Sequence, residues 1–226
     1  MLIHDHVWSY TGHKLNSLIF VDLHPKSFYP QQEYQIMVKD LPLCFQKIDS
    51  WMYDYYLHIN PGKTEVTIFG DQSVLNKLQI HGSFISQFIC VRFVSTVKNL
   101  GFRLDSTLSF NKQVMNIKSK AFQKLRSLSK MKSFLNHQQL QILTQGLVLS
   151  SLDYCNALYF GIEHHLINQL QCIQNSACRV IFGLKRKEYV AGQLKELHWL
   201  KIQERIEFKL LTLVYKCLNG ITPQYI

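Results

Sequence analysis

The sequence lacks the features that mark a membrane-spanning or secreted chain. No apolar run reaches the roughly 18 to 20 residues that a membrane-spanning helix needs. The nearest run, Leu147–Ile162, is interrupted by Asp153 and Asn156. The first ten residues, MLIHDHVWSY, contain no basic segment followed by an apolar one, so we expect no secretory signal. We therefore expect an intracellular protein.

Acidic residues are scarce, and no two of them are adjacent. The 226 residues include 15 Asp and Glu against 25 Lys and Arg, which gives a formal charge of +10. No acidic residue occurs between Ser106 and Asp153. Such an excess of positive charge favours an anionic partner, with nucleic acid the first candidate and a membrane surface the second. We predict nucleic acid, bound with low specificity, and no membrane.

Paired cysteine spacings are also absent. The six cysteines show no CxxC spacing of the kind that holds zinc. Most of them occupy apolar positions in helical patterns, which favours reduced, buried thiols over a disulfide framework. We predict no metal site and no cofactor in this chain. The cysteines are Cys44, Cys90, Cys155, Cys172, Cys178 and Cys217.

Two helical patterns meet at Gly161, and the rest of the chain is organised around them. Each repeats apolar residues every three or four positions, the spacing of one helix face. Gly161 supplies a helix stop, and the short link to His164 favours antiparallel neighbours. We predict a helical hairpin at Leu140–Leu184 as the most buried helical element. The first face comprises Leu140, Leu143, Leu147, Ser151, Tyr154 with Cys155, and Leu158; the second comprises Leu166, Leu170, Ile173, Ala177, and Val180 with Ile181.

A basic helix is predicted before this hairpin. Ser109 is a candidate N-cap, and the apolar stripe runs through Val114, Ile117, Ala121, Leu125, Leu128 and Met131. The remaining positions carry cations without acidic partners, so contact with phosphates and mere solubility remain as alternative explanations. The cations are Lys112, Lys118, Lys120, Lys124, Arg126, Lys130 and Lys132.

Two further features follow the hairpin. A second basic cluster consists of Arg179, Lys185, Arg186 and Lys187. A last helix, ended by Gly220, is predicted to bury its apolar face. That face comprises Ile202, Ile206, Leu210, Leu213, Val214 and Cys217.

The first half of the chain predicts a smaller layer. Residues 1–30 are unassigned apart from a candidate strand at Ser17–Leu23, and residues 31–105 predict a small α+β segment. Within it we expect a helix at Gln31–Tyr56 and strands at 65–69, 77–81, 84–93 and 97–104. Residues 106–226 predict an all-helical half. The fold class is therefore α+β.

The GKT triplet at Gly62–Thr64 resembles the end of a phosphate-binding P-loop, but the motif fails. Its first glycine would fall at Leu57, and a P-loop leads from a strand into a helix, whereas here a helix precedes and a strand follows. We therefore reject nucleoside triphosphate binding by this route. A turn at Pro61-Gly62 places Lys63 at the start of the strand.

The order of several motifs resembles the C-terminal part of reverse transcriptases from LINE-type, non-LTR retrotransposons of the jockey-like group. The motifs are INPGKTEV, VKNLGFRLDSTLSF, SSLDYCNALYFGI, INQLQCIQNSACRVI and LKELHWLKIQERIEFKLLTLVYKCLNGITPQYI, and the resemblance covers residues 31–226. It implies the end of a polymerase palm followed by a thumb that holds the template–primer duplex. By this resemblance, Lys63 lies near the phosphates of the incoming nucleotide. Asn99, Leu100 and Gly101 belong to the hairpin that grips the primer end.

This chain differs from the family at the catalytic hairpin. Family members carry a tyrosine-alanine-aspartate-aspartate hairpin that would fall at His13–Asn16, where this chain reads HKLN. Polymerisation with two Mg²⁺ ions, as in the intact family, needs clustered carboxylates. Because the preceding palm strands are missing, we expect an open sheet edge near Thr64–Phe69 or Ser17–Leu23.

Three functional hypotheses follow. The first is a truncated, inactive remnant of an RNA-directed DNA polymerase with residual non-specific affinity for RNA or an RNA–DNA duplex. The second is a fragment of an intact reverse transcriptase gene. The third is a helical protein-interaction module that uses apolar positions left exposed by the lost palm. The sequence does not indicate an oligomeric state.

Overall fold

The fold is α+β and is divided between two compact units. A computed structural model describes residues 6–11, 14–22, 46–58, 60, 64–77, 83–85 and 90–222. Unit 1 comprises Met1–Ser109 and contains the sheet, whereas unit 2 comprises Phe110–Ile226 and is helical.

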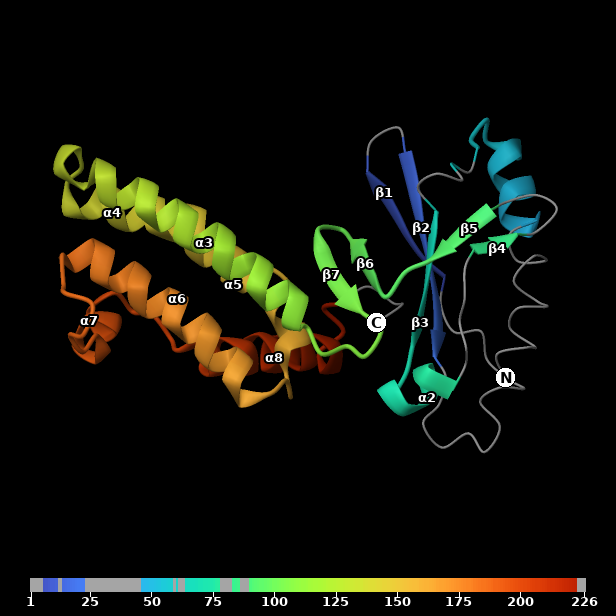
Figure 1. Ribbon diagram of the computed structural model, residues 1–226. Coiled ribbons are helices and arrows are strands. Elements are labelled where there is room, and N and C mark those ends of the chain that lie inside the picture. Colours follow the sequence, from blue (N-terminus) through green and yellow to red (C-terminus); the bar gives the residue numbers. More distant parts are fainter. Residues whose placement is uncertain are drawn as a thin grey trace. The chain divides into compact units, whose positions relative to one another are not determined.

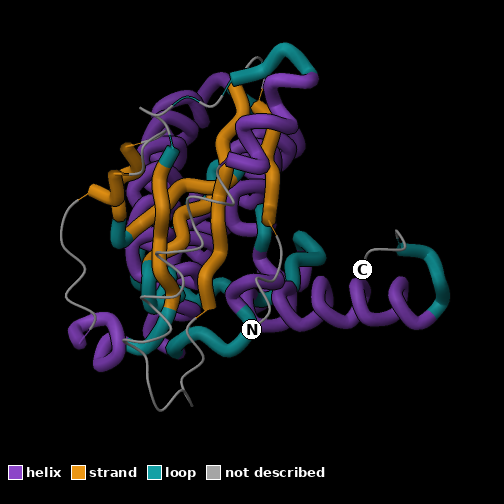
Figure 2. The backbone as a smooth tube through the Cα atoms, turned by 90° about the vertical axis from the view of Figure 1, so that its right-hand side faces the viewer, coloured by secondary structure: helices purple, strands orange, loops and turns teal. Residues whose placement is uncertain are grey.

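Unit 1 is built on a mixed five-stranded sheet of order β1-β2-β3-β5-β4. The outer pairs, β1 with β2 and β4 with β5, are antiparallel, and β3 lies parallel to both β2 and β5. Figure 2 shows these strands in orange. Helix α2 (Gln72–Lys77) follows β3. The strands are β1 (His6–Thr11), β2 (Lys14–Asp22), β3 (Glu65–Phe69), β4 (Ser83–Ile85) and β5 (Cys90–Phe93).

The sheet corrects two predictions. The expected open edge is wrong for the described part of the two named segments, because β2 and β3 are interior strands that each pair with two neighbours. The single strand expected at 84–93 is two antiparallel strands, with Ile85 opposite Cys90. Of the helix expected at Gln31–Tyr56, the described part is helical over residues 46–54, and residues 31–45 lie outside the described residues.

A two-stranded hairpin completes unit 1. Strands β6 (Thr96–Asn99) and β7 (Phe102–Asp105) form one antiparallel ladder. Val97 of β6 and Phe69 of β3 are both buried in one apolar cluster, which attaches the hairpin to the sheet. The Thr67 hydroxyl adds a hydrogen bond to the Val94 carbonyl at 2.9 Å.

Residues 104–107, LDST, lie in a turn at the end of unit 1 that is stabilised by Asp105. The Asp105 carboxylate is buried and accepts hydrogen bonds from the Ser109 backbone N–H at 2.7 Å and from the Thr107 hydroxyl at 3.0 Å. Ser109 is therefore part of this turn, and the prediction that it is the N-cap of the next helix is wrong. The N-cap is Phe110, which has a left-handed backbone and makes no side-chain capping bond.

Unit 2 consists of helices that pack side by side. Figure 1 shows α3 beside the segment containing α4 and α5, with α6 returning antiparallel to that segment. Short helix α7 and the longer α8 follow. The helices are α3 (Asn111–Met131), α4 (His137–Thr144), α5 (Ser150–Asp153), α6 (His164–Phe182), α7 (Ala191–Glu196) and α8 (Ile202–Leu218).

The core of unit 2 confirms the predicted helical hairpin. Val148, Leu170 and Ile173 are 0%, 1% and 0% exposed. The apolar stripe of α3 is also buried at every predicted position except Met131, which is 44% exposed. Gly161, with a φ of 81°, lies in the turn between the two arms, in the left-handed region that glycine adopts without strain.

A π-helical turn at Gln145–Leu149 changes the first arm of the hairpin. The Ser150 N–H bonds to the Gln145 carbonyl five residues back, so the turn contains one residue more than an α-helical turn. The buried face shifts accordingly to Val148, Leu149 and Leu152. The prediction that the first face runs through Leu147, Tyr154, Cys155 and Leu158 is wrong, because these residues are exposed.

Two other burial predictions need correction. In α8, Ile202 and Ile206 are buried as predicted, but Leu213, Val214 and Cys217 are exposed. Among the cysteines whose exposure the structure describes, Cys178 is buried and Cys155, Cys172 and Cys217 are exposed free thiols. The apolar spacing in both cases identifies a helix face, but it does not reveal whether a neighbouring element covers that face.

Candidate nucleic-acid interface

The cations of α3 fall into two groups. With 3.6 residues per turn, Lys112, Arg126 and Lys130 lie on the side of the helix opposite the buried stripe, and Lys120 lies about a quarter turn from that stripe. All four side chains are exposed. Lys118, Lys124 and Lys132 flank the buried stripe and are only partly exposed. The first group is called the outer face of α3 below.

The three flanking lysines contact neighbouring helices of unit 2. Lys118 Nζ donates to Gln169 Oε1 of α6 at 3.2 Å. Lys124 Nζ donates to the carbonyl oxygen of Leu147, in the π-helical turn, at 2.6 Å. Lys132 Nζ lies against Gly183 at the C-terminal end of α6, where a cation is favoured by the partial negative charge of the helix end. These lysines therefore help to join the helices, which sequence spacing alone did not reveal.

The second basic cluster is also divided. Arg179 points its guanidinium at the backbone, with Nε 3.2 Å and Nη2 3.0 Å from the Glu188 carbonyl oxygen. Lys185, Arg186 and Lys187 are exposed in the turn that Arg179 holds. Of the predicted binding residues of unit 2, those on the outer face of α3 and in this turn are exposed, whereas the Arg179 guanidinium is hydrogen-bonded within the turn.

In unit 1, the three residues assigned to a primer-gripping hairpin do form a hairpin turn. Asn99 pairs with Phe102, and the two residues between them, Leu100 and Gly101, have φ values of 46° and 90°. Positive φ at both central positions is the geometry that fits the twist of a two-residue hairpin. Lys63 lies outside the described residues.

Two cations on the same hairpin were missed by the sequence analysis. Lys98 and Arg103 are cross-strand partners, and both are exposed. They add two positive charges to the surface of this hairpin. The alternation of the two strands around Leu100-Gly101 was the signal that could have identified the pair.

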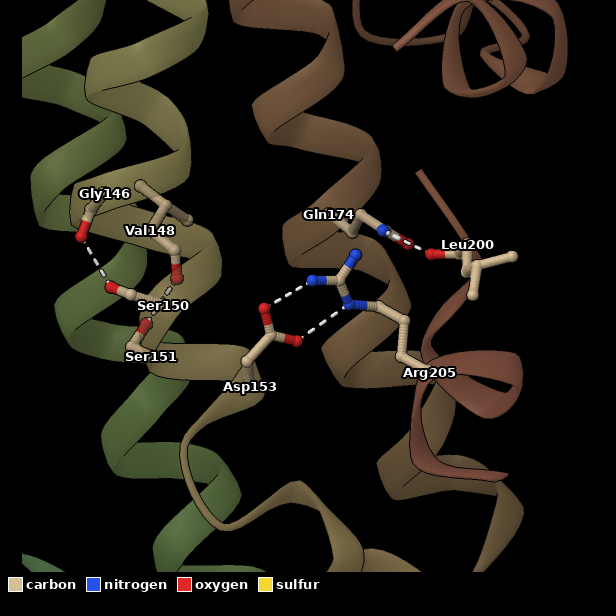
Figure 3. Close-up of polar contacts among 8 residues, drawn as sticks. All are labelled: Gly146, Val148, Ser150, Ser151, Asp153, Gln174, Leu200 and Arg205. Carbon is tan, nitrogen blue, oxygen red and sulfur yellow. Dashed lines mark hydrogen bonds and ion pairs between the residues drawn. The ribbon is translucent and has the colours of Figure 1, made fainter. Parts of the chain in front are cut away.

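The polar residues of two family-like motifs have structural roles. In LDYCN, the Asp153 carboxylate binds the Arg205 guanidinium of α8 in a bidentate pair, with Oδ1 2.8 Å from Nε. In LQCIQN, Gln174 is fully buried and donates from Nε2 to the Leu200 carbonyl at 2.8 Å, while Gln171 Oε1 accepts from the Ile202 N–H at 2.9 Å. Figure 3 shows the Asp153 and Gln174 contacts. These residues fasten the start of α8 to the hairpin.

A cavity lies beside the ion pair. It has a volume of about 480 Å³, and Leu149, Leu197, Trp199 and both members of the pair are among its lining residues. The carboxylate and guanidinium neutralise each other there, so the cavity lacks the net positive charge that a phosphate would require. We do not assign it to the nucleic-acid interface.

The residues do not fit the Mg²⁺ ions that the family resemblance implies. The β1–β2 hairpin turns between Thr11 and Lys14, the resemblance places the aspartate pair at Leu15 and Asn16 of β2, and residues His13–Asn16 contain no carboxylate. Within the described ranges, no group of three or more His, Cys, Asp or Glu residues could hold a metal ion. In the same part of the chain, no helix has the length and apolar character to cross a membrane.

Comparisons with protein-family models, curated proteins and solved structures give no match to this chain.

Proposed function

We propose that this chain is a truncated, inactive remnant of a LINE-type reverse transcriptase, comprising the end of the palm and the thumb, that binds nucleic acid without sequence preference. The observation that carries the binding proposal is the outer face of α3. Its four cations are exposed, three of them opposite the buried stripe, and no acidic residue occurs on the helix. A solvated helix face normally mixes both signs of charge, and this one does not.

Two hairpins support the resemblance to this family. The β1–β2 hairpin includes His13–Asn16, the segment that the resemblance aligns with the family's catalytic hairpin. The β6–β7 hairpin presents Asn99, Leu100 and Gly101 in its turn, with Lys98 and Arg103 beside them. An RNA–DNA duplex is the ligand that such a palm and thumb would hold. The same observations are compatible with a fragment of an intact reverse transcriptase gene.

The binding proposal is tested by fluorescence anisotropy with a short RNA–DNA duplex over a series of salt concentrations. Each phosphate contact contributes a log–log slope of roughly −0.7 to −0.9, so a variant with Lys120, Arg126 and Lys130 changed to Gln should flatten the slope by about two to three units. These three side chains lie away from the core, so circular dichroism should be unchanged. We exclude Lys118 and Lys124 from the variant because both contact neighbouring helices.

A charge-matched control separates a local site from net charge. Lys195, Lys209 and Lys216 are exposed on α7 and α8, and changing them to Gln removes the same three charges. This control should retain the slope of the parent. A parent with a flat salt response, or equal effects of the two triple variants, would show that the outer face of α3 is not a binding site.

The exposed apolar side of α8 favours a second candidate, a helical interaction module. Phe208, Leu211, Tyr215 and Leu218 are 63%, 67%, 63% and 82% exposed. Exposed apolar residues gathered on one helix are typical of surfaces that associate. Sedimentation velocity over a concentration series tests it, with self-association that is insensitive to salt and is lost in Leu211→Glu/Leu218→Glu as the expected result. A monomer at all concentrations would exclude self-association.

A further inference from the structure

The turn between α6 and α7, residues 183–190, is a pre-formed structure. Gly183, with a φ of 70°, ends α6, and the N–H groups of Gly183 and Leu184 both bond to the Arg179 carbonyl. The Arg179 guanidinium makes two hydrogen bonds to the Glu188 carbonyl. The Glu188 carboxylate in turn accepts from the Lys185 N–H at 3.1 Å. These bonds fix the backbone of a segment that projects from the helices.

The side chains presented by this turn are cationic and aromatic. Lys185, Arg186 and Lys187 are exposed, and the Tyr189 side chain is 93% exposed. Glu188 supplies one negative charge, so the turn retains a local charge of +2, three positive charges less one. Val190, the next residue, is 6% exposed and anchors the end of the turn in the core. An ordered backbone therefore presents a tyrosine ring that packs little against its own unit.

A second segment contributes to the same end of unit 2. Lys132 Nζ lies against Gly183, at a distance of 2.5 Å from the position that a Cβ there would take. The rings of His137 and Phe182 are 5.1 Å apart. The C-terminal end of α3 and the C-terminal end of α6 are thus neighbours, as Figure 1 shows. The α3 end adds Lys130 and the Phe134 ring, which is 86% exposed.

We propose that this end of unit 2 binds single-stranded RNA or DNA, with a base stacked on Tyr189 and the flanking phosphates held by Lys185, Arg186 and Lys187. Every nucleobase has a π face, so an exposed ring beside cations binds unpaired nucleotides with little regard to sequence. A base inside a duplex is already stacked and cannot take this position. The inference rests on the proposed binding of nucleic acid and deepens it. The outer face of α3 contacts duplex backbone, and the α6–α7 turn takes unpaired nucleotides.

The test compares three labelled ligands on the full chain by fluorescence anisotropy. They are a single-stranded RNA, a blunt RNA–DNA duplex, and the same duplex with a single-stranded extension. Stacking of one base on an aromatic ring contributes roughly 1 to 3 kcal/mol. Tyr189→Ala should therefore weaken binding of the single strand and of the extended duplex by about 5-fold or more, and should leave the blunt duplex unchanged. Tyr189→Phe should bind like the parent because it retains the ring.

Matched controls make each outcome decisive. Tyr215→Ala, which removes a 63% exposed ring from α8, should leave all three affinities unchanged. If Tyr189→Ala binds the single strand like the parent, the inference fails. The proposed function is still tested separately by the salt dependence of duplex binding. If the parent binds none of the three ligands, both fail. Binding of anionic phospholipid vesicles that is stronger than RNA binding and depends on Tyr189 would overturn the inference in favour of a membrane surface.

Discussion

Asp153 and Arg205, which lie 52 residues apart, are joined by two hydrogen bonds between a carboxylate and a guanidinium, with Oδ1 2.8 Å from Nε. The pair connects α5 to α8 across unit 2. It is only partly shielded, since the Asp153 side chain is 42% exposed and that of Arg205 is 20% exposed. Its contribution to stability is therefore reduced by solvent.

We predict that Asp153→Asn and Arg205→Gln each destabilise unit 2 modestly, and that a double-mutant cycle gives a coupling energy of about 1 kcal/mol. Urea unfolding followed by circular dichroism measures it. The coupling should shrink in high salt, because the pair is partly exposed. A coupling energy of zero at low salt would mean that the contact does not fasten α8.

A side chain at Gly183 should be destabilising. Its φ of 70° disfavours L-residues, and a new Cβ would meet Lys132 Nζ at 2.5 Å. Gly183→Ala should lower the free energy of unfolding by about 1 kcal/mol. Gly192→Ala is the matched control, because Gly192 lies in α7 with open space around it, and this change should be neutral or stabilising.

Lys132→Ala separates the two causes of this effect. In the Lys132→Ala background the clash is gone and only the backbone cost of a positive φ remains. The penalty of Gly183→Ala should therefore be smaller there but still present. Equal penalties in both backgrounds would show that the lysine can move aside freely.

Stability should decline in alkali because of two buried acids. Burial raises the pKa of the Cys178 thiol from 9.0 to about 11, and burial raises the pKa of Tyr159 from 10.0 to about 12. The folded state holds each proton more tightly than the unfolded state does. The stabilisation is thus complete below pH 9 and is lost as the pH rises through the folded pKa values, at no more than about 1.4 kcal/mol per pH unit for each group.

Cys178→Ala tests the contribution of the thiol. The variant will be less stable overall because it leaves a cavity, so the slope of stability against pH is the informative quantity. Between pH 9 and 11 the slope should be shallower in the variant than in the parent.

At pH 8, alkylation of the native protein should modify the exposed Cys155, Cys172 and Cys217 and spare Cys178. Peptide mass mapping gives this result directly.

Primer extension with this chain should yield no product above buffer with either Mg²⁺ or Mn²⁺. Two-metal catalysis requires clustered carboxylates, and the sequence contains no two adjacent acidic residues. Denaturing gel electrophoresis of a labelled primer on an RNA template provides the measurement. Extension that disappears in Asp5→Asn or Asp22→Asn would instead show that these carboxylates form a metal site.

The sequence predicted the α+β class and the positions of α3 and α6 because each depends on a repeated local pattern. Val114 through Leu128 and Leu166 through Ile181 keep one helical period throughout, and the structure buries that face of each helix. Which residues of α8 are buried, in contrast, depends on contacts with elements that are distant in sequence. Periodicity could not show that Val214 would be exposed while Ile206 is buried.

The candidate site was predictable in composition but not in orientation. The cations of α3 were evident from the sequence, yet the inward role of Lys124 depends on the Leu147 carbonyl, 23 residues away. Tyr189 belongs to no repeating sequence pattern that would have distinguished it from other surface tyrosines. Only the structure shows it exposed on a turn that Arg179 and Glu188 hold in place.

The π-helical turn at Gln145–Leu149 behaves as a one-residue insertion in an otherwise regular helix. A homologue without the extra residue would form an unbroken α-helix and still bury the counterparts of Leu140 and Val148. Aligning the two sequences correctly would then require a single gap between Thr144 and Ser150. A gap-free alignment would shift every interior position after the turn by one residue.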